Sequence, residues 1–468
     1  MTHGRGWMSD LLASVQAAPP VKSVEVMERI LKEKFSALDV SFMITDLGGN
    51  AVVRLTGFQD EIGEGEPERF ALAGTLYERV IRSQQLWVDD GSRADAHEDR
   101  LAGDGEDRLA GDDEDRRAGD GDRGPEERGG DSGSAMQRTS HVVAPVSDRG
   151  DAIGLLELTL PGAPGREMLQ RIAEAAHALA YVVIVNRRFT DLFEWGRRST
   201  RMSLASEIQH RLLPESFTCD AGPFIVAGSL EPAAEIGGDT FDYALNRSGL
   251  HLSLTDAMGH DVRAAQLATV VVSALRNARR AGLDLVAQAS AANVAVAEHA
   301  VQEHRAVVTE SAKVQNALAR HGAQAMATGQ LMWVSFETGA ATYVNAGHVW
   351  PLLLRGGRVR EITPLVDLPF GVDPKHEYRL QTLDLRKGDR LVLITDGMLE
   401  PGGDPRSLSR LIEETATQHP RDAVRAFTRS VLHATGHDPR DDATVLCLEW
   451  SGAAWSDRDA PWDGHLQV

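Results

Sequence analysis

Three apolar stretches in the second half of the chain have the pattern of buried strands, and each adjoins acidic residues. They are residues 250–255 before Asp256, residues 390–395 before Asp396, and residues 443–450 after Asp441 and Asp442. Short runs rich in Leu, Val and Ile are typical of strands in a covered sheet. Because side chains at neighbouring strand ends can converge, we expect these acids to form one cluster although they lie far apart in the sequence.

The first half of the chain combines helical and strand patterns around a polar insertion. Helical spacing covers residues 24–35 and 70–82, and alternating patterns predict strands at residues 40–45, 51–55, 141–146 and 152–160. The sequence DLGGN at residues 46–50 is typical of a turn between the first two strands. These elements predict an N-terminal α/β domain at residues 24–164, after a tail at residues 1–23.

The insertion in this domain, residues 89–137, is strongly acidic and repetitive. From Asp89 to Asp131 it holds 17 Asp and Glu against 7 Arg, a net charge of −10 that is half of the −20 of the whole chain. Similar acidic motifs recur in it with a period of eight residues. Because it has almost no large apolar side chains, we expect a disordered loop. The same charge argues against nucleic acid as a partner.

A long helical pattern follows, from about Gly165 to Leu213. Apolar residues recur along it at helical spacing, which suits a signalling helix or one strand of a two-stranded coiled coil. We therefore expect residues 165–213 to be a helical linker through which the protein forms a homodimer. The alternative is a helix that packs against its own domains, which the many Ala and Val residues of the apolar stripe also fit.

Length and composition predict two domains and a linker inside the cell. A chain of 468 residues is too long for one compact core, and only two cysteines suit a reducing compartment. The first ten residues lack the apolar core of a secretory signal. The longest apolar run, residues 178–185, is far shorter than the about 20 residues that a membrane span needs. We expect a cytoplasmic protein without a membrane span.

Four acidic signatures in the second half predict binding of hard divalent cations. They are Gly237-Gly238-Asp239, Asp256-Ala257-Met258-Gly259-His260, Thr395-Asp396-Gly397 and Arg440-Asp441-Asp442-Ala443-Thr444. Glycines beside the acids suit tight turns and let backbone carbonyls approach an ion. Oxygen ligands favour Mg²⁺ or Mn²⁺, and no zinc pattern competes because Cys219 and Cys447 stand alone. One Asp-Gly by itself is typical of a turn, so the prediction depends on the series.

The order and spacing of these signatures resemble those of the PPM-type metal-dependent serine/threonine phosphatases, in the bacterial branch called SpoIIE-like. The resemblance covers about residues 203–450. It includes further motifs, which are residues 207–214 (EIQHRLLP), 235–242 (EIGGDTFD), 345–348 (NAGH), 367–371 (DLPFG) and 388–389 (GD). It implies an α+β protein whose C-terminal PPM phosphatase domain, residues 203–450, is an αββα sandwich, followed by a tail at residues 451–468.

The resemblance also implies a role for each acid. The metal ligands that it implies are Asp239, Asp256, the carbonyl of Ala257, Asp396 and Asp441. Asp256 corresponds to the carboxylate that bridges the two metals, Asp239 binds directly or through water, and Asp442 is an alternative to Asp441. Two divalent cations, Mn²⁺ or Mg²⁺, activate a shared water for attack on a phosphomonoester, so Asp256 and Asp396 are the expected catalytic residues.

Two features depart from the family pattern. Met258 stands where eukaryotic members of the superfamily have a His two residues after the bridging Asp, and we assign a catalytic role to neither His260 nor His348. We expect His348, in the NAGH motif, to orient the core near the site. Residues 301–324 form a polar, Ala-rich stretch that the family usually keeps shorter; we interpret it as a solvated helical insertion, with an altered substrate-docking surface as the alternative.

The N-terminal domain resembles a GAF sensor domain in the order of its elements and in residues 144–146 (APV) and 154–158 (GLLEL). Together the two resemblances imply a protein phosphatase for phosphoserine and phosphothreonine that is regulated by the sensor domain. The implied substrate is a phosphorylated anti-sigma-factor antagonist of the STAS type. A catalytically inactive docking or scaffold protein in a sigma-factor pathway is the second hypothesis, and the complete set of acids favours the enzyme.

Overall fold

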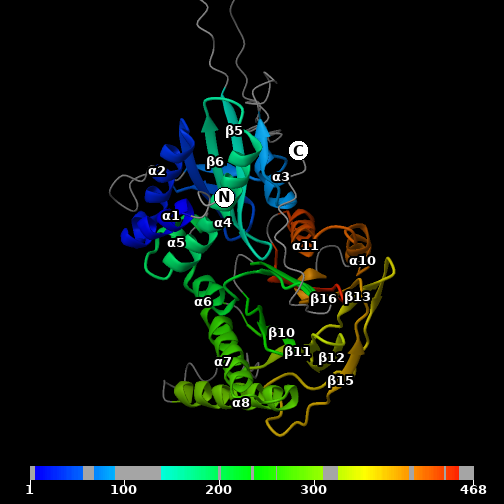
Figure 1. The fold of residues 1–468 in the computed structure, drawn as a ribbon. Coiled ribbons are helices and arrows are strands. Elements are labelled where there is room, and N and C mark those ends of the chain that lie inside the picture. The colour runs from blue at the N-terminus through cyan, green and yellow to red at the C-terminus, as the bar shows by residue number, and fades with distance from the viewer. Residues whose placement is uncertain are drawn as a thin grey trace, which may run out of the picture. The chain divides into compact units, whose positions relative to one another are not determined.

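The chain folds into two compact units, which are shown in a computed structural model (Figure 1). The structure describes residues 6–55, 68–89, 139–198, 202–232, 237–259, 261–308, 325–399, 405–436 and 439–452. The boundary between the units falls at residue 199, and the turn 149–151 is grouped with the second unit. The acidic repeat expected at residues 89–137 lies outside the described residues apart from Asp89, as does the expected C-terminal tail beyond Gly452.

The N-terminal unit is built on a six-stranded sheet with the strand order β3-β2-β1-β6-β5-β4. The strands are β1 (Asp39–Thr45), β2 (Ala51–Arg54), β3 (Arg69–Ala71), β4 (Trp87–Asp89), β5 (Ser140–Asp148) and β6 (Asp151–Leu160). The helices are α1 (Gly6–Ala17), η1 (Pro20–Lys22), α2 (Ser23–Phe35), α3 (Leu76–Ser83), α4 (Arg166–Asn186) and α5 (Leu192–Arg197). Because alternate residues of a strand face opposite sides of a sheet, Phe42 packs in the core with α2 and α4, and Met43 packs in the core with α3.

Two expectations for this unit are wrong in detail. Helix α1 lies within the residues expected to be a tail, and it folds against the sheet because Leu11 and Val15, one helical turn apart, are both buried in the core. Residues 70–82 are not one helix, because β3 occupies their start and α3 begins only at Leu76. Gly74, with a φ of 73°, lies in the turn after β3, and Thr75 caps the new helix.

The helical linker expected at residues 165–213 is three helices in the structure: α4, α5 and α6 (Leu204–Leu212). The apolar stripe of α4 is buried in the core of the N-terminal unit, for example at Ile172, Leu179 and Val183. A new helix begins after Thr190, whose hydroxyl oxygen accepts a hydrogen bond from the N–H of Leu192 at 3.2 Å. The stripe therefore serves packing within one unit, which was the alternative interpretation of the pattern.

Helix α4 is also the one helix in the described part of the chain that is long and apolar enough to cross a membrane. Of its most apolar stretch, 44% is buried inside the protein. The core helix of a folded domain meets the same criteria of length and composition, and the buried stripe of α4 is part of such a core.

The C-terminal unit is a sandwich of two sheets with helices on both outer faces, as the αββα class predicts (Figure 1). The five-stranded sheet has the order β15-β12-β11-β10-β9, and the six-stranded sheet has the order β14-β13-β16-β17-β8-β7. The strands are β7 (Thr218–Asp220), β8 (Phe224–Glu231), β9 (Thr240–Leu245), β10 (Gly249–Ala257), β11 (Ala327–Ser335), β12 (Ala340–Ala346), β13 (Leu352–Arg355), β14 (Arg358–Glu361), β15 (Gln381–Asp384), β16 (Asp389–Ile394) and β17 (Ala443–Trp450). The helices besides α6 are α7 (Asp261–Arg280), α8 (Leu285–Val308), η2 (Asp396–Met398), α10 (Pro405–Glu414) and α11 (Pro420–Ala434).

Three apolar layers fix these elements against one another. The layer between the sheets includes Phe224, Leu252 and Leu446. Helices α7 and α8 cover the five-stranded sheet with side chains such as Val271, and α10 and α11 cover the six-stranded sheet with side chains such as Phe427. Burying one large apolar side chain contributes about 1.5–3 kcal/mol, so the layers define a rigid frame at whose edge the acids lie.

Candidate functional site

Every strand predicted beside an acid is present in the structure. β10 contains Asp256 and ends at Ala257, β16 ends two residues before Asp396, and β17 begins directly after Asp441 and Asp442. β9 and β10 pair antiparallel, so the start of β9, which follows Asp239, lies beside the end of β10. β16 and β17 also pair antiparallel, so the end of β16 lies beside the start of β17. Each sheet therefore unites two of the four signatures.

Hydrogen bonds join the signatures across the sandwich. Asp239 is only 2% exposed, and its Oδ2 accepts hydrogen bonds from the hydroxyls of Thr395 at 2.7 Å and Thr444 at 2.6 Å. A further hydrogen bond joins the same two signatures, because the N–H of Gly237, before β9, donates to Oδ1 of Asp442, before β17, at 3.2 Å. Residues from both sheets therefore share one buried polar network.

Close packing requires glycine beside these acids. A Cβ on Gly238 would lie 2.3 Å from the carbonyl oxygen of Ala257, whose N–H donates to the carbonyl of Gly238 at 3.3 Å. A Cβ on Gly237 would lie 2.8 Å from a carboxylate oxygen of Asp442, and one on Gly397 would lie 2.1 Å from the Asp442 carbonyl. Real Cβ atoms do not approach so closely. The glycines therefore allow the four signatures to converge, as the sequence predicts.

The carboxylates are close enough to change one another's pKa. Burial, followed by the charges of Asp256 and Asp442, raises the pKa of Asp239 well above its usual range. Burial, followed by the charges of Asp396, Asp441 and Asp442, raises the pKa of Asp256 to about 7. A like charge disfavours ionisation of its neighbour, so the five carboxylates belong to one electrostatic cluster.

This cluster has the donor chemistry of a site for hard divalent cations. It offers carboxylate oxygens, and a bound cation would relieve the repulsion that raises the pKa of Asp239 and Asp256. Within the described ranges, no three His, Cys, Asp or Glu side chains stand together as ligands of one ion. The structure thus brings the acids to one edge, and the ligand assignments of Asp239, Asp256, Ala257, Asp396 and Asp441 stay predictions.

The two adjacent acids before β17 have different surroundings. Asp442 is buried, and its carboxylate accepts hydrogen bonds from the N–H of Gly237 and from Nε2 of Gln209. Asp441 is half-buried, and its Oδ1 accepts a hydrogen bond from the N–H of Asp442 at 2.8 Å. Because the carboxylate of Asp442 already accepts hydrogen bonds from Gly237 and Gln209, Asp441 is the better candidate of the two for the predicted metal ligand.

Sequence reasoning did not single out Gln209, Thr395 and Thr444 as parts of the site. Gln209 is buried on α6, and its Nε2 donates to the carbonyl of Asp239 at 2.9 Å as well as to the Asp442 carboxylate. All three residues lie inside motifs that carry the family resemblance. Their positions were therefore visible, but hydrogen bonds across the sandwich have no local pattern that could assign them a role.

His348 belongs to the frame of the site. It is buried, its Nδ1 lies 2.6 Å from Oγ1 of Thr328, and its Nε2 lies 3.0 Å from the carbonyl oxygen of Ile394. Burial lowers the pKa of His348 to about 4, so the ring is neutral near pH 7, with Nε2 donating and Nδ1 accepting. Both nitrogens are engaged, which agrees with the expected orienting role.

The two departures from the family pattern are only partly within the structure. Met258 is 42% exposed, and His260 lies outside the described residues. Of the insertion expected at residues 301–324, residues 301–308 form the end of α8, and residues 309–324 lie outside the described residues.

Comparison with known proteins finds a family that the C-terminal part of this chain matches. Residues 246–451 match the family model described as Stage II sporulation protein E (SpoIIE). Similar solved structures are the RsbU and RsbW domains of Rv1364c from Mycobacterium tuberculosis, the PP2C phosphatase domain with a regulatory fragment of SpoIIE from Bacillus subtilis, and the SiaA-PP2C domain of Pseudomonas aeruginosa. Their sequence identities are 24%, 17% and 21%, with TM-scores of 0.40, 0.39 and 0.41. The matches cover 51%, 48% and 53% of this chain and 62%, 63% and 94% of the others, so this chain spans less than two thirds of the first two.

The family match contains three of the four acidic signatures and most strands of both sheets. Its bounds enclose Asp256 at the end of β10 and the whole of β17. Residues 246–451 therefore match the SpoIIE family over the part of the C-terminal unit that carries most of the acids.

Proposed function

We propose that this protein is a metal-dependent phosphatase that hydrolyses phosphoserine and phosphothreonine in a protein substrate. The observation that carries the proposal is the carboxylate cluster at the shared edge of the two sheets, four of whose five acids lie in the segment that matches the SpoIIE family. The mutual effect of these acids on their pKa values is the electrostatic signature of a site that needs compensating positive charge.

The proposed ligands of two divalent cations, Mn²⁺ or Mg²⁺, are Asp239, Asp256, the carbonyl of Ala257, Asp396 and Asp441, with Asp256 shared between both ions. When bound, such cations lower the pKa of a water held between them and neutralise charge on a phosphoryl group. The chain's own contribution is to hold the acids. Thr395 and Thr444 both donate to Oδ2 of Asp239, which fixes the carboxylate and leaves Oδ1 for a ligand role.

We further infer that the N-terminal unit is a GAF-like sensor domain that regulates the phosphatase in the cytoplasm. The proposed substrate is a phosphorylated anti-sigma-factor antagonist of the STAS type. These inferences rest on the sequence resemblances and on the SpoIIE family match of the C-terminal segment. Association of two chains through helices in the region 165–213 is part of the same proposal, with α4 contributing only side chains that its own unit leaves exposed, such as Tyr181 and Val185.

Phosphate release from p-nitrophenyl phosphate by the full chain tests the proposal. We expect turnover with Mn²⁺ or Mg²⁺, loss of turnover with EDTA, and recovery when the cation is restored. Absence of turnover with both cations would leave the second hypothesis, a docking or scaffold protein with the same fold. Calorimetric titration of Mn²⁺ provides a readout that does not depend on activity, because a scaffold without the metal function would bind no stoichiometric ion.

A further inference from the structure

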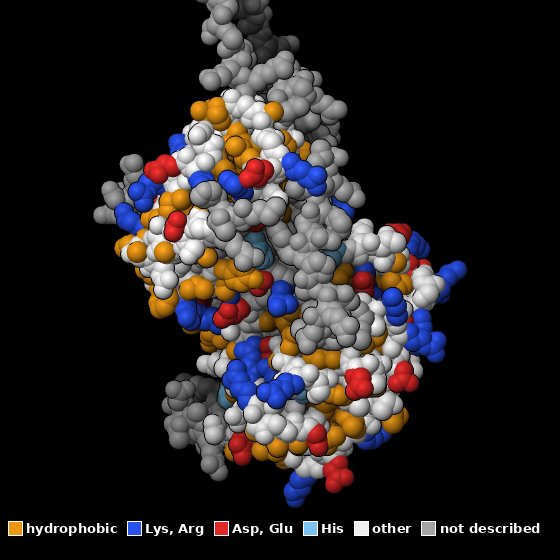
Figure 2. All heavy atoms as spheres, in the orientation of Figure 1, with side chains coloured by type: hydrophobic (Ala, Val, Ile, Leu, Met, Phe, Trp, Pro, Cys, Tyr) orange, Lys and Arg blue, Asp and Glu red, His pale blue; other side chains and the backbone are white. Residues whose placement is uncertain are grey.

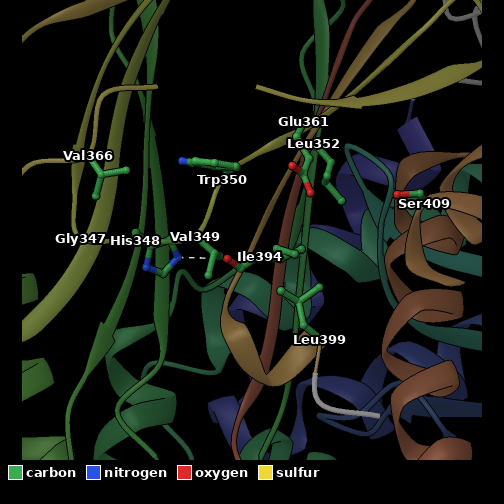
Figure 3. Close-up of a pocket in the computed structure, with 10 residues that line it drawn as sticks. All are labelled: Gly347, His348, Val349, Trp350, Leu352, Glu361, Val366, Ile394, Leu399 and Ser409. Carbon is green, nitrogen blue, oxygen red and sulfur yellow. Dashed lines mark hydrogen bonds between the residues drawn. The ribbon is translucent and has the colours of Figure 1, made fainter. Parts of the chain in front are cut away.

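A cavity of about 450 Å³ opens in the C-terminal unit next to the segment that carries Asp396 (Figure 3). Residues 347–350 and Val366 form one side, and Leu352, Leu399 and Ser409 lie toward the other. Its volume is within the range of about 300–1,000 Å³ that is typical of ligand sites, and its lining is mostly apolar, as in such sites. The side chain of Glu361 adds one acid to the wall.

This cavity borders the chain segment that carries Asp396. Ile394 and Leu399, which line it, stand on either side of Asp396 in the segment that leaves β16 and enters η2. The ring of His348, which also lines it, is hydrogen-bonded to the carbonyl oxygen of Ile394. Residues on both sides of Asp396 in the sequence therefore form part of the cavity wall.

The rim of the cavity displays apolar side chains to solvent. Trp350 is 43% exposed and Val366 is 44% exposed. Leu365 and Leu368, on the same loop as Val366, are exposed as well. Hydrophobic side chains also reach the surface among charged ones on the visible face of this unit in Figure 2. An apolar rim around an open cavity marks a surface for contact with another polypeptide.

The loop that carries this rim is held firmly. The N–H of Asp367 donates to the carbonyl of Asn345 at 2.9 Å, and Phe370 exchanges two backbone hydrogen bonds with Ala327. Arg379 donates to Asp367 through Nε at 2.7 Å and through its backbone N–H at 2.9 Å. These bonds attach the loop to the strands that end at the site, so the apolar residues are presented in a fixed position.

We propose that this cavity is a docking pocket for an apolar side chain of the phosphorylated polypeptide, close in sequence to the residue being dephosphorylated. The inference rests on the proposed phosphatase function. Asp396 and Leu399 are three residues apart in a segment that begins as a 3₁₀ turn, which rises about 2 Å per residue. An extended peptide advances about 3.3 Å per residue, so a side chain two to four residues from the phosphorylated one reaches the cavity.

A phosphopeptide scan with the full chain and Mn²⁺ tests this assignment. Each peptide has one phosphoserine in an Ala-rich background, and one Leu is moved through positions −4 to +4. For the wild type we expect Leu at one or two positions to raise kcat/KM about tenfold over the Leu-free peptide, because burial of one such side chain is worth that much. Val366→Asp and Trp350→Ala should abolish this gain.

The matched control is Val372→Asp, which makes the same change at an exposed position of the same loop that does not line the cavity. This control should keep the gain from Leu. A flat scan with the wild type, or a gain that survives in Val366→Asp, would overturn the docking pocket while p-nitrophenyl phosphate turnover upholds the phosphatase. Loss of p-nitrophenyl phosphate turnover in the wild type would overturn the phosphatase and the pocket together.

Discussion

Asp256 is the acid on which the proposed chemistry depends most. Asp256→Asn keeps the size of the side chain and removes the charge that a bridging ligand must carry. We expect Mn²⁺-dependent turnover of p-nitrophenyl phosphate to fall at least about a hundredfold. Because burial and like charges raise the pKa of Asp256 to about 7, loss of its charge should leave the melting temperature of the metal-free protein unchanged or higher.

The control for this variant is Asp384→Asn, at an exposed position of β15 in the same sheet. It should retain both turnover and melting temperature. Wild-type rates in Asp256→Asn would overturn the metal assignment.

Glu28 is a buried carboxyl group in the N-terminal unit, where its Oε1 accepts a hydrogen bond from the N–H of Phe42 at 2.8 Å. Burial raises the pKa of Glu28 to about 8, from the model-peptide value of 4.5. The folded unit therefore holds a proton that the unfolded chain has released between these two values. The contribution of this proton on Glu28 to the free energy of unfolding is complete below about pH 4.5 and is lost as the pH rises through about 8.

We expect the melting temperature of the N-terminal unit to decrease from pH 5 to pH 9 and Glu28→Gln to reduce this decrease. Gln keeps an acceptor for the N–H of Phe42 and cannot ionise. Calorimetry of the full chain at several pH values measures the effect. Glu33→Gln, at an exposed position of α2, should keep the wild-type slope. Equal slopes in wild type and Glu28→Gln would show that Glu28 is ionised in the folded protein.

Helix α6 is attached to both halves of the site by a single side chain. Gln209 donates to the carbonyl of Asp239 before β9 and to the carboxylate of Asp442 before β17. Gln209→Leu keeps a similar volume and leaves these buried oxygens without their donor. We expect the free energy of unfolding to fall by about 1–3 kcal/mol, measured by urea denaturation. The Mn²⁺ concentration for half-maximal turnover should rise, because Asp239 and Asp442 lose a common anchor.

Gln302→Leu is the matched control, because it makes the same change at an exposed position of α8. It should leave both the unfolding curve and the metal requirement as in the wild type. If Gln209→Leu behaved in the same way, the hydrogen bonds of α6 would have no part in holding the site.

Elements with a strong local pattern could be predicted from the sequence, and elements decided by tertiary contacts could not. β17 covers residues 443–450 as predicted, because a short run of apolar residues between polar ones is typical of a strand in a covered sheet. β3 has only three residues, too few for any periodicity, and its pairing with β2 decides its conformation. α4 was predicted as part of a longer helix because an apolar stripe looks the same whether its own domain or a partner covers it.

The same limit applies to the site. The acids could be predicted because Asp256, Asp396, Asp441 and Asp442 each stand beside a recognisable apolar strand pattern. The role of Gln209 depends on a side chain that spans from a helix to the ends of two strands, one from each sheet. Such contacts exist only after the sandwich has formed.

The acidic insertion is the largest part of the chain whose role depends on how the whole molecule is connected. It lies between β4, which ends at Asp89, and β5, which begins at Ser140. These strands pair antiparallel, with Trp87 opposite Val143 and Asp89 opposite His141. The two ends of the insertion are therefore held together as in a hairpin, and a short connection can replace the long one without moving either strand.

We expect deletion of residues 95–131 to leave turnover of p-nitrophenyl phosphate unchanged and the melting temperature unchanged or slightly higher. Because the deleted residues include almost no large apolar side chains, we expect them to contribute little to a core. Shortening the connection from 50 residues to 13 lowers the entropy cost of closing it by about 1 kcal/mol. A Gly-Ser segment of the original length is the control, because it removes the acidic side chains and keeps the loop length. If both variants lost several degrees of melting temperature, the acidic residues themselves would have to make stabilising contacts in the folded protein.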